Sequence, residues 1–343
     1  MTIRQKAFNL AERAPVPDVL VRLAIEQLVS RTSRLLARAD RCSTARFAED
    51  LARLPIAIHT DVANAQHYEM PASFYELVLG SQRKYSCCYF DSPRATLGDA
   101  EERALELTGE HADLADGQTI LELGCGWGSL SLWMARKYPG ANIVAVSNSR
   151  SQRVFIEQRV REQSLANLSV ESADMNEFRT KQQFERIVSV EMFEHMSNWR
   201  ELLGRARSWI APGGRMFMHI FSHRTTPYFF DHSNEDDWIA QHFFTGGVMP
   251  SHDLIRCYSD HFEVEKEWHW DGSHYARTAD RWLARFDANA EAVARIFDAV
   301  YGSQSKLWQR RWRLFFLATS GLFGFKQGHE WGVSHFLLKP TNR

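Results

Sequence analysis

The chain has 343 residues, with 41 Lys and Arg against 42 Asp and Glu and a formal net charge of −1. This length can bury a sizeable core in one large or two modest domains, and the balanced charge argues against nucleic acid or anionic lipid as a partner. The five cysteines fit neither a zinc-ligand spacing nor a secreted disulfide framework, so we expect reduced thiols, no metal and a cytoplasmic protein.

Residues 1–60 are expected to form a helical extension. They contain VLVRLAIEQLVSRTSRLLARADR, in which apolar residues recur at helical spacing with arginines between them. Such an extension either closes over a site formed by the rest of the chain or pairs with a second copy in a homodimer. The first residues have no sustained apolar stretch, which argues against a secretory signal.

Strand-like and helix-like segments alternate between about 100 and 222. The strand-like runs are QTILELGCG, ANIVAVSNS, LSVESADM, FERIVSVEMF and RMFMHIFS. The helix-like runs between them are WGSLSLWMARKYP, RSQRVFIEQRVREQSLA and WRELLGRARSWIAPGG. This alternation predicts an α/β fold built on a parallel, doubly wound sheet.

After residue 222 the alternation gives way to polar and aromatic loops, followed by a strand-like FEVEKEWHW and a helix over ARTADRWLARFDANAEAVARIF. The apolar run LFFLATSGLFGF, residues 314–325, spans about 12 residues, fewer than the roughly 20 that cross a bilayer. It predicts a buried helix, with a lipid-facing surface as the alternative, and no stable membrane insertion.

Three glycines, Gly124, Gly126 and Gly128, follow the first strand in LELGCGWG. At the carboxyl end of a strand in an open parallel sheet, glycines let the backbone approach a ligand; a tight turn with nothing bound is the alternative. No Gly-Lys-Ser/Thr follows, which excludes a P-loop. A dinucleotide is disfavoured because the spacing is G-x-G-x-G and because Asn148, rather than an acid, ends the second strand.

The fourth strand runs into EMFEHM, which contains Glu191, Glu194 and His195. If this motif opens a helix, the two later residues lie at i+3 and i+4 from Glu191, on one side of it. Two carboxylates and an imidazole at the carboxyl end of a strand can accept a proton and bind a cation. The alternative is a helix N-terminus whose acids only complement the helix dipole.

The pattern from Glu122 to Gly128 resembles motif I of class I S-adenosylmethionine (SAM) methyltransferases. In that family the glycines pass under the methionine part of SAM, and an acidic residue near the third strand faces the adenine, where this chain has Asp174 and Met175. HYEMPASFYELVLG, KYSCCYF, VSNSRSQRVFIE, EMFEHM, NEDDW and FFTGGVMPS follow in the order typical of the cyclopropane-fatty-acyl-phospholipid synthase superfamily. Over roughly residues 55–290 the chain is most similar to the coclaurine N-methyltransferase branch.

The resemblance implies a class I, Rossmann-like methyltransferase fold with a helical N-terminal extension and a lid or cap insertion after strand five. The methyltransferase domain would cover residues 61–343, with a SAM-binding core at about 100–222 and substrate-covering segments at about 223–343. It implies SAM as cofactor, S-adenosylhomocysteine as product, and N-methylation of a small, partly aromatic amine of the tetrahydroisoquinoline type.

The resemblance also implies roles for particular residues. Glu191, Glu194 and His195 belong to the amine site as catalytic residues. The cofactor-binding residues are Ser86, Gly124, Gly126, Gly128, Asn148, Gln152, Asp174 and Met175. The aromatic residues expected to cover the substrate, for which plain packing is an equal alternative, are Phe221, Trp238, Phe243, Phe244 and Tyr275.

Two other functions stay open at this point. A cyclopropane synthase or lipid C-methyltransferase acting on unsaturated acyl chains would use Cys87, Glu194, His219 and Tyr275 as counterparts of that family's bicarbonate site. Glu191 and Cys88 weigh against it, because lipid-modifying members typically carry glycine at both places, and because an acid beside the transferred methyl suits a cationic amine. A SAM-binding protein without activity is the third interpretation.

Overall fold

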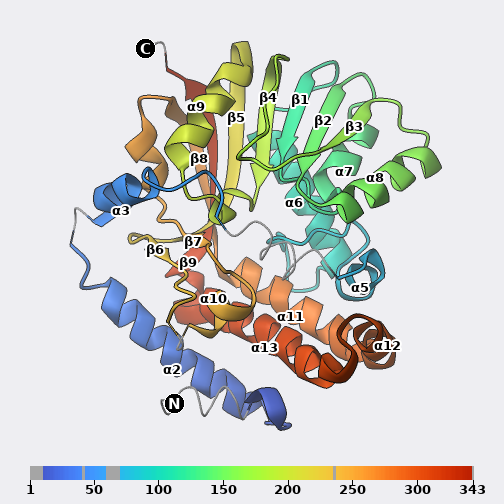
Figure 1. Cartoon of the computed structure of the whole chain (residues 1–343), viewed down its shortest axis with the longest axis vertical. Helices are drawn as coiled ribbons and strands as arrows, with labels where there is room; N and C mark the ends of the chain where they lie inside the picture. Colours follow the sequence, from blue (N-terminus) through green and yellow to red (C-terminus); the bar gives the residue numbers. More distant parts are fainter. Residues whose placement is uncertain (1–10, 41–42, 59–69, 235–236, 342–343) are drawn as a thin grey trace.

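The computed structural model describes residues 11–40, 43–58, 70–234 and 237–341. Residues 1–10, 41–42 and 59–60 of the expected N-terminal extension, and parts of the segments HYEMPASFYELVLG and NEDDW, lie outside the described residues. Figure 1 shows a sheet in the upper half of the molecule, helices α11 to α13 below it, and α2 along the lower edge.

A seven-stranded sheet with the order β3-β2-β1-β4-β5-β9-β8 forms the centre of the fold. Its strands are β1 (Thr119–Leu123), β2 (Asn142–Ser147), β3 (Leu168–Ser172), β4 (Phe184–Val190), β5 (Ile210–His223), β8 (Phe262–Asp271) and β9 (Trp331–Pro340). The first five strands are parallel, whereas β9 runs antiparallel to both β5 and β8. The α/β prediction is confirmed, with an antiparallel pair added at one edge; β6 (Tyr228–Phe229) and β7 (Val248–Met249) form a separate ribbon.

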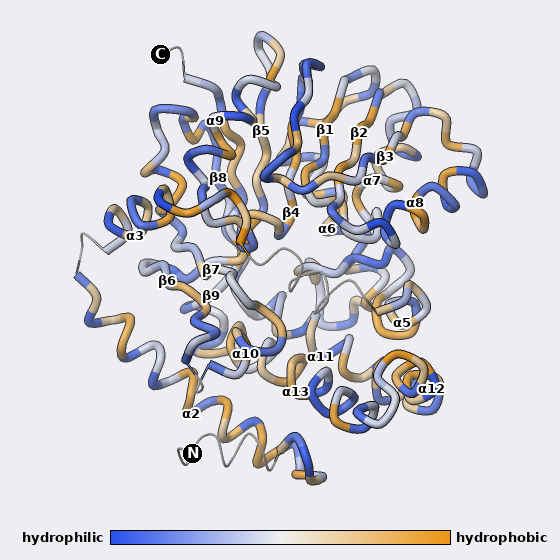
Figure 2. The backbone as a smooth tube through the Cα atoms, in the orientation of Figure 1, coloured by the Kyte–Doolittle hydropathy of each residue, from blue (hydrophilic) through white to orange (hydrophobic). Residues whose placement is uncertain are grey.

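Both faces of the sheet are buried. Neighbouring residues of a strand point to opposite faces and therefore belong to two different cores. Ile120 and Ile143 belong to one core with α6 (Leu97–His111), α7 (Ser129–Lys137) and α8 (Arg150–Glu162). Leu121 and Val144 belong to a second core with α3 (Ser43–Leu51), α9 (Trp199–Trp209) and the 3-10 helix η2 (Leu254–Tyr258). The central strands are accordingly mostly hydrophobic in Figure 2.

The C-terminal segment is mainly helical, and one expectation about it is wrong. The run ARTADRWLARFDANAEAVARIF forms two helices, α11 (Ser273–Ala288) and α12 (Ala290–Tyr301), rather than one. Asn289 separates them because its side-chain amide donates to the carbonyl oxygens of Leu77 (3.1 Å) and Arg285 (2.9 Å). An asparagine that bonds backbone groups in this way competes with helix continuation.

The apolar run 314–325 lies mostly within α13 (Ser305–Gly324), where Phe315, Phe316, Leu317 and Phe323 are buried. In the part of the chain that the structure describes, no helix is both long and apolar enough to cross a membrane. The helices η3 (Gly302–Gln304) and η4 (Phe325–Gly328) flank α13.

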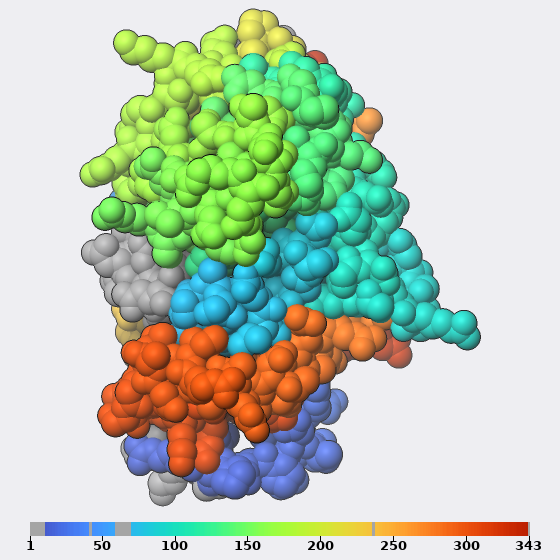
Figure 3. Space-filling model, turned by 90° about the vertical axis from the view of Figure 1, so that its right-hand side faces the viewer, coloured from blue at the N-terminus to red at the C-terminus, as the bar shows by residue number. Residues whose placement is uncertain are grey.

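The N-terminal helix α2 (Asp18–Leu36) packs along α13. The Arg313 guanidinium donates to both carboxylate oxygens of Asp18, at 2.6 and 2.9 Å. Figure 3 shows the resulting layers from the side: the sheet layer, then α5 (Ala72–Val78), the C-terminal helices, and α2 farthest from the sheet.

Helix α3 and the residues after it take a different course, toward the sheet. The side-chain amide of Asn198, the N-cap of α9, donates to the carbonyl oxygens of Ala52 (3.2 Å) and Leu54 (2.9 Å). This contact brings residues 56–58 to the carboxyl ends of the central strands.

Candidate active site

Two adjoining pockets open at the carboxyl ends of β1, β2 and β4. The first, which we call the Asp174 pocket, has about 680 Å³ of empty volume, and the second, the Ser86 pocket, about 610 Å³. Gly124, Gly126, Gln152 and Glu191 line both. The two pockets therefore meet at the glycine loop, Gln152 and Glu191.

The glycine loop combines two kinds of constraint. Gly126 has φ 52°, and a Cβ built there meets no described atom within 4 Å, so the position borders open space. Gly128 has φ 80° and is the N-cap of α7; a Cβ there would lie 2.7 Å from Cγ1 of Ile156. Gly126 therefore leaves room for a ligand, whereas Gly128, which is in the lining of neither pocket, shapes the start of α7.

Most residues expected to bind the cofactor come together around this loop. Asn148, Asp174 and Met175 line the Asp174 pocket, and Ser86 lines the Ser86 pocket. Gln152 is 1% exposed and its Oε1 accepts from the Ser147 hydroxyl at 2.7 Å, while its Nε2 has no hydrogen-bond partner among the described residues. A buried amide donor left in this way calls for an acceptor in the site, which is consistent with a polar ligand such as SAM.

Some lining residues were not expected from the sequence. Ala57 and Ile58, from the segment after α3, line the Asp174 pocket, and Lys84 and Ser129 line the Ser86 pocket. Lys84 is 3% exposed and donates to Oγ of Ser86 (2.5 Å) and the carbonyl oxygen of Cys87 (2.6 Å). The residue pattern carries no signal for Ala57 or Ile58, because only folding brings an N-terminal segment to the strand ends.

The motif EMFEHM does not open an α-helix, which corrects that expectation. Glu191 has a left-handed backbone, with φ 47°, and a 3-10 turn, η1 (Phe193–His195), follows. The next helix, α9, begins at Trp199. The backbone N–H of Glu191 donates to the carbonyl oxygen of His219 at 2.8 Å, so the turn is fixed against β5.

The Glu191 carboxylate is the centre of a buried hydrogen-bond network. Oε1 accepts from the backbone N–H of Cys87 at 2.9 Å and lies 3.2 Å from Nε2 of His219. Oε2 accepts from the Tyr275 hydroxyl at 2.6 Å. Burial raises the pKa of Glu191, while the charge of Lys84 and the hydrogen bonds from Cys87 and Tyr275 oppose that rise.

Glu194 lies next to Glu191 and is fully buried. Its Oε1 accepts from the backbone N–H of Phe221 at 2.6 Å, and its Oε2 has no hydrogen-bond partner among the described residues. Burial, and then the charge of Glu191, raise the pKa of Glu194 well above its usual value. Two interacting carboxyls in a buried site titrate as a pair, with the first proton held strongly.

His195 and three of the expected aromatic residues lie beside these carboxyls. The His195 ring lines the Asp174 pocket and stacks on Phe244, with ring centroids 4.6 Å apart. Phe244 meets Phe221 edge-on at 5.5 Å, and Tyr275 stacks on Phe323 at 4.3 Å. We call Phe221, Phe244, Tyr275 and Phe323 the aromatic wall.

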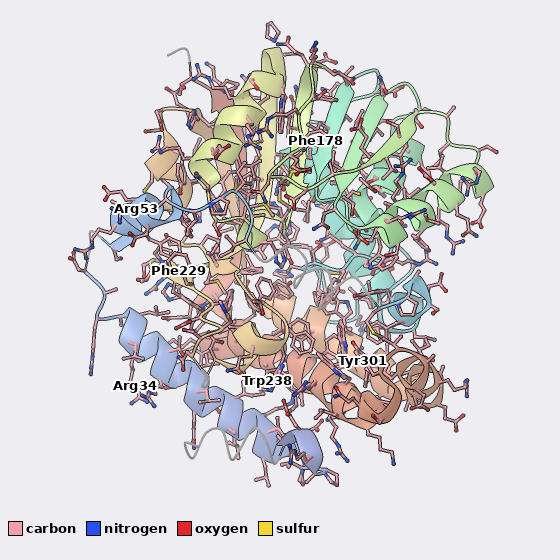
Figure 4. All side chains as sticks on the ribbon, in the orientation of Figure 1. Arg34, Arg53, Phe178, Phe229, Trp238 and Tyr301 are labelled. Carbon is pink, nitrogen blue, oxygen red and sulfur yellow. The ribbon has the colours of Figure 1, made fainter. Side chains whose placement is uncertain are left out.

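Trp238 and Phe243 are placed differently. Nε1 of Trp238 donates to Oε1 of Glu12 at 2.6 Å, and Arg311 of α13 also bonds Glu12. Phe243 stacks on Phe315 of α13 with centroids 4.4 Å apart. In Figure 4, Trp238 lies with helix α10 (Trp238–His242) near the C-terminal helices. Trp238 is thus linked to α13 through Glu12 and Phe243 packs on α13 directly, and neither is in the lining of the two pockets.

Comparison with known proteins gives consistent matches. Residues 58–328 match the family model described as mycolic acid cyclopropane synthetase. The chain is 37% identical over 298 residues to an (S)-coclaurine N-methyltransferase of Thalictrum flavum subsp. glaucum, covering 85% of this chain and 82% of that protein. It is 27% identical over 274 residues to a cyclopropane-fatty-acyl-phospholipid synthase of Escherichia coli strain K12, covering 79% and 67%.

A solved structure also matches over nearly the whole chain. This structure, a coclaurine N-methyltransferase bound to N-methylheliamine and S-adenosylhomocysteine, superposes with a TM-score of 0.94 at 32% identity. The match covers 97% of this chain and 99% of the other.

Proposed function

The chain belongs to the mycolic acid cyclopropane synthetase family and is a SAM-dependent methyltransferase, and from this premise we propose that it methylates the nitrogen of a small, partly aromatic amine. The observation that carries the proposal is the buried, hydrogen-bonded carboxylate of Glu191 between the two pockets. A relative of the same family is bound to N-methylheliamine, an amine, which supports this acceptor class.

The cofactor would occupy both pockets. Asn148, Asp174 and Met175 would hold its adenosine end, and Gly124, Gly126, Gln152 and Ser86 its methionine end, with Gly128 acting through the start of α7. When bound, SAM supplies a methyl group on a sulfonium, which a nitrogen lone pair can attack. The Nε2 of Gln152, which has no hydrogen-bond partner among the described residues, supports a hydrogen bond to this ligand.

The acceptor amine would arrive largely protonated at neutral pH, so its proton must leave before attack. Burial and the charge of Glu191 raise the pKa of Glu194 further than the pKa of Glu191 is raised, so Glu194 would keep a proton. Glu191 would be ionised in the free enzyme, bind the ammonium group of the acceptor and then accept its proton. A positioned base contributes about 10²–10⁴ in rate, and alignment of the reacting groups up to about 7–11 kcal/mol.

His195 and the aromatic wall would position the acceptor. Phe221, Phe244 and Tyr275 lie next to the carboxyls, outside the linings of the two pockets, and a cation over an aromatic ring gains about 0.5–2 kcal/mol. We propose Trp238 and Phe243 as residues that hold α10 in place over the site rather than as direct contacts.

We also propose a separate role for each of three parts of the chain. Of the 1–60 extension, the segment after α3 would act as the lid, since Ala57 and Ile58 line the Asp174 pocket, whereas α2 packs along α13. Residues of about 100–222 would form the SAM-binding core, and those of about 223–343 the substrate cover, to which Phe244 and Tyr275 belong.

Lipid cyclopropanation is less consistent with the geometry. Of the four counterparts of a bicarbonate site, three meet Glu191: the backbone N–H of Cys87, Nε2 of His219 and the hydroxyl of Tyr275. A bicarbonate ion there would compete with the Glu191 carboxylate for the Cys87 N–H and the Tyr275 hydroxyl and be repelled by its charge.

The proposal is tested by incubating the protein with SAM and either tetrahydroisoquinolines or vesicles of unsaturated phospholipid, and by measuring product masses. We expect methylated amine only, reduced about 10²–10⁴-fold in Glu191→Gln. Glu263→Gln, which changes an exposed carboxylate on β8, is the matched control. Modified acyl chains without methylated amine, or SAM binding without turnover on either substrate, would overturn the proposal.

A further inference from the structure

Three histidines continue the hydrogen-bond network from Glu191 along one face of the sheet. His219 of β5 is paired in register with His335 of β9, and His335 with Trp268 of β8. Residues paired across neighbouring strands project to the same face. This row lies under α6, whose last residue, His111, stacks on Trp268 with ring centroids 3.9 Å apart.

Each ring nitrogen along this row meets the next group at hydrogen-bond distance. Nε2 of His219 lies 3.2 Å from Oε1 of Glu191, and Nδ1 of His219 lies 2.8 Å from Nε2 of His335. Nδ1 of His335 in turn lies 2.8 Å from Nδ1 of His111. His219 and His335 are fully buried, whereas His111 is half-buried and reaches the surface.

The environment keeps the two inner rings neutral. Burial lowers the pKa of His219 and His335 far below the usual value, and the charge of Lys84 lowers both further. A neutral imidazole has one donor and one acceptor nitrogen, so the row can align its N–H groups in either of two directions. Such a row can pass a proton along without holding a stable charge.

We propose that His219, His335 and His111 form a proton relay that carries the acceptor's proton from Glu191 to solvent. The inference rests on the proposed function, because methylation of a protonated secondary amine releases one proton per turnover. Glu191 takes that proton from the amine and must lose it before the next cycle.

Each step of the relay breaks one bond to hydrogen and forms another. The Glu191 O–H breaks as its proton passes to Nε2 of His219, and the Nδ1–H of His219 passes to Nε2 of His335. The Nδ1–H of His335 then passes to Nδ1 of His111, and the Nε2–H of His111 goes to water or buffer. Each passage leaves His219 and His335 with their proton on the nitrogen that faces Glu191, and a half-turn of each ring, once per turnover, points that N–H toward solvent again.

Charged groups around the row favour passage rather than storage of the proton. Lys84, from the loop before α6, and His269, on β8, both disfavour a cation on His335. At the outer end, Glu110 favours and Arg103 disfavours the charged form of His111, and burial lowers its pKa to about 4. A proton that reaches His111 is therefore released at neutral pH.

The test compares two acceptors in His335→Gln, whose amide can still hydrogen-bond its neighbours but cannot relay a proton. With a protonated secondary amine at pH 7, we expect kcat to fall about tenfold, a part of the 10²–10⁴ that a base contributes. The loss should shrink as the pH approaches the pKa of the amine, and added imidazole should restore part of the rate. A weakly basic tertiary amine, unprotonated at pH 7, should react at the wild-type rate.

His111→Ala, at the solvent end, should give the same pattern and serves if the buried variant does not fold. His252→Ala is the matched control, since His252 bonds Ser334 beside the row without joining it. Equal losses with both acceptors at every pH, or no loss in either relay variant, would overturn the relay. If the wild-type protein methylates neither amine, the proposed function fails instead.

Discussion

At the scale of single residues, the glycine loop separates ligand binding from folding. Gly126 borders open space in both pockets, whereas Gly128 faces Ile156 and starts α7. Both have a positive φ, which costs an L-residue roughly 1–2 kcal/mol. The two glycines thus carry a similar backbone constraint but differ in what a side chain would meet.

This difference makes alanine substitutions informative. Gly126→Ala should weaken SAM binding at least tenfold with a stability loss of about 1–2 kcal/mol from backbone strain, because its methyl group enters the ligand site. Gly128→Ala should cost more stability, since its Cβ would lie 2.7 Å from Ile156. Calorimetric titration with SAM measures the affinity of each variant, and thermal unfolding measures its stability. If Gly126→Ala and Gly128→Ala lost the same affinity and the same stability, the two glycines would not have the separate roles assigned to them.

At the scale of elements, Asn176 clamps Ala57 of the N-terminal segment against the pocket, in addition to the contacts of that segment with Asn198. Asn176, in the loop after β3, accepts from the backbone N–H of Ala57 at 3.1 Å and donates to its carbonyl oxygen at 3.0 Å. Asp174, two residues before Asn176, bonds the backbone N–H of Asn176 at 2.7 Å. These two hydrogen bonds between Asn176 and Ala57, which we call the Asn176 clamp, hold a segment distant in sequence as one wall of the Asp174 pocket.

Asn176→Ala should weaken SAM binding by about tenfold, because each lost hydrogen bond is worth roughly 0.5–1.5 kcal/mol and the pocket wall is released. The matched control is Asn167→Ala, since Asn167 also bonds two backbone groups, the carbonyl oxygens of Ala135 and Tyr138, but lies outside both pocket linings. Both variants should lose stability and only the first should lose affinity. Parallel losses of affinity would show that the clamp has no special role.

At the scale of the whole molecule, stability should depend on pH through buried carboxyls. Burial raises the pKa of Glu122 to about 7, opposed by a hydrogen bond from the Ser131 hydroxyl. Because the folded protein holds this proton more tightly than the unfolded chain, the stabilisation is present below pH 4.5 and is lost as the pH rises toward 7. Buried histidines act oppositely over acidic pH, since they must gain protons on unfolding.

Glu122→Gln isolates the first contribution. Relative to the wild-type protein, this variant should gain about 2–3 kcal/mol of unfolding free energy between pH 4.5 and 8. Urea unfolding of both proteins across this range, without SAM, measures the difference. A difference that stays constant with pH would show that Glu122 ionises normally in the folded state.

The residue pattern by itself determined the alternation of strands and helices, the glycine loop and the segment that carries Glu191, because the spacing of apolar residues and the residues that form turns are local properties. It allowed a helix start at EMFEHM, and it predicted one helix where the structure has α11 and α12. In both places a tertiary contact prevailed: the bond from Glu191 to β5, and the bonds of Asn289 to α5 and α11. It also left β9 unassigned, since Gly332, Ser334 and His335 interrupt the apolar residues of WGVSHFLLKP and leave no clear period.

The family resemblance grouped Cys87, His219 and Tyr275 in one site, but only the tertiary structure decided that they meet at the Glu191 carboxylate. Cys87, His219 and Tyr275 come from a loop, a strand and a helix that are far apart in sequence. The same holds for Ala57 in the pocket and for His335 and His111 beyond His219. Local patterns encode elements, but the partners of a buried carboxylate depend on strand order and on register, which no local pattern contains.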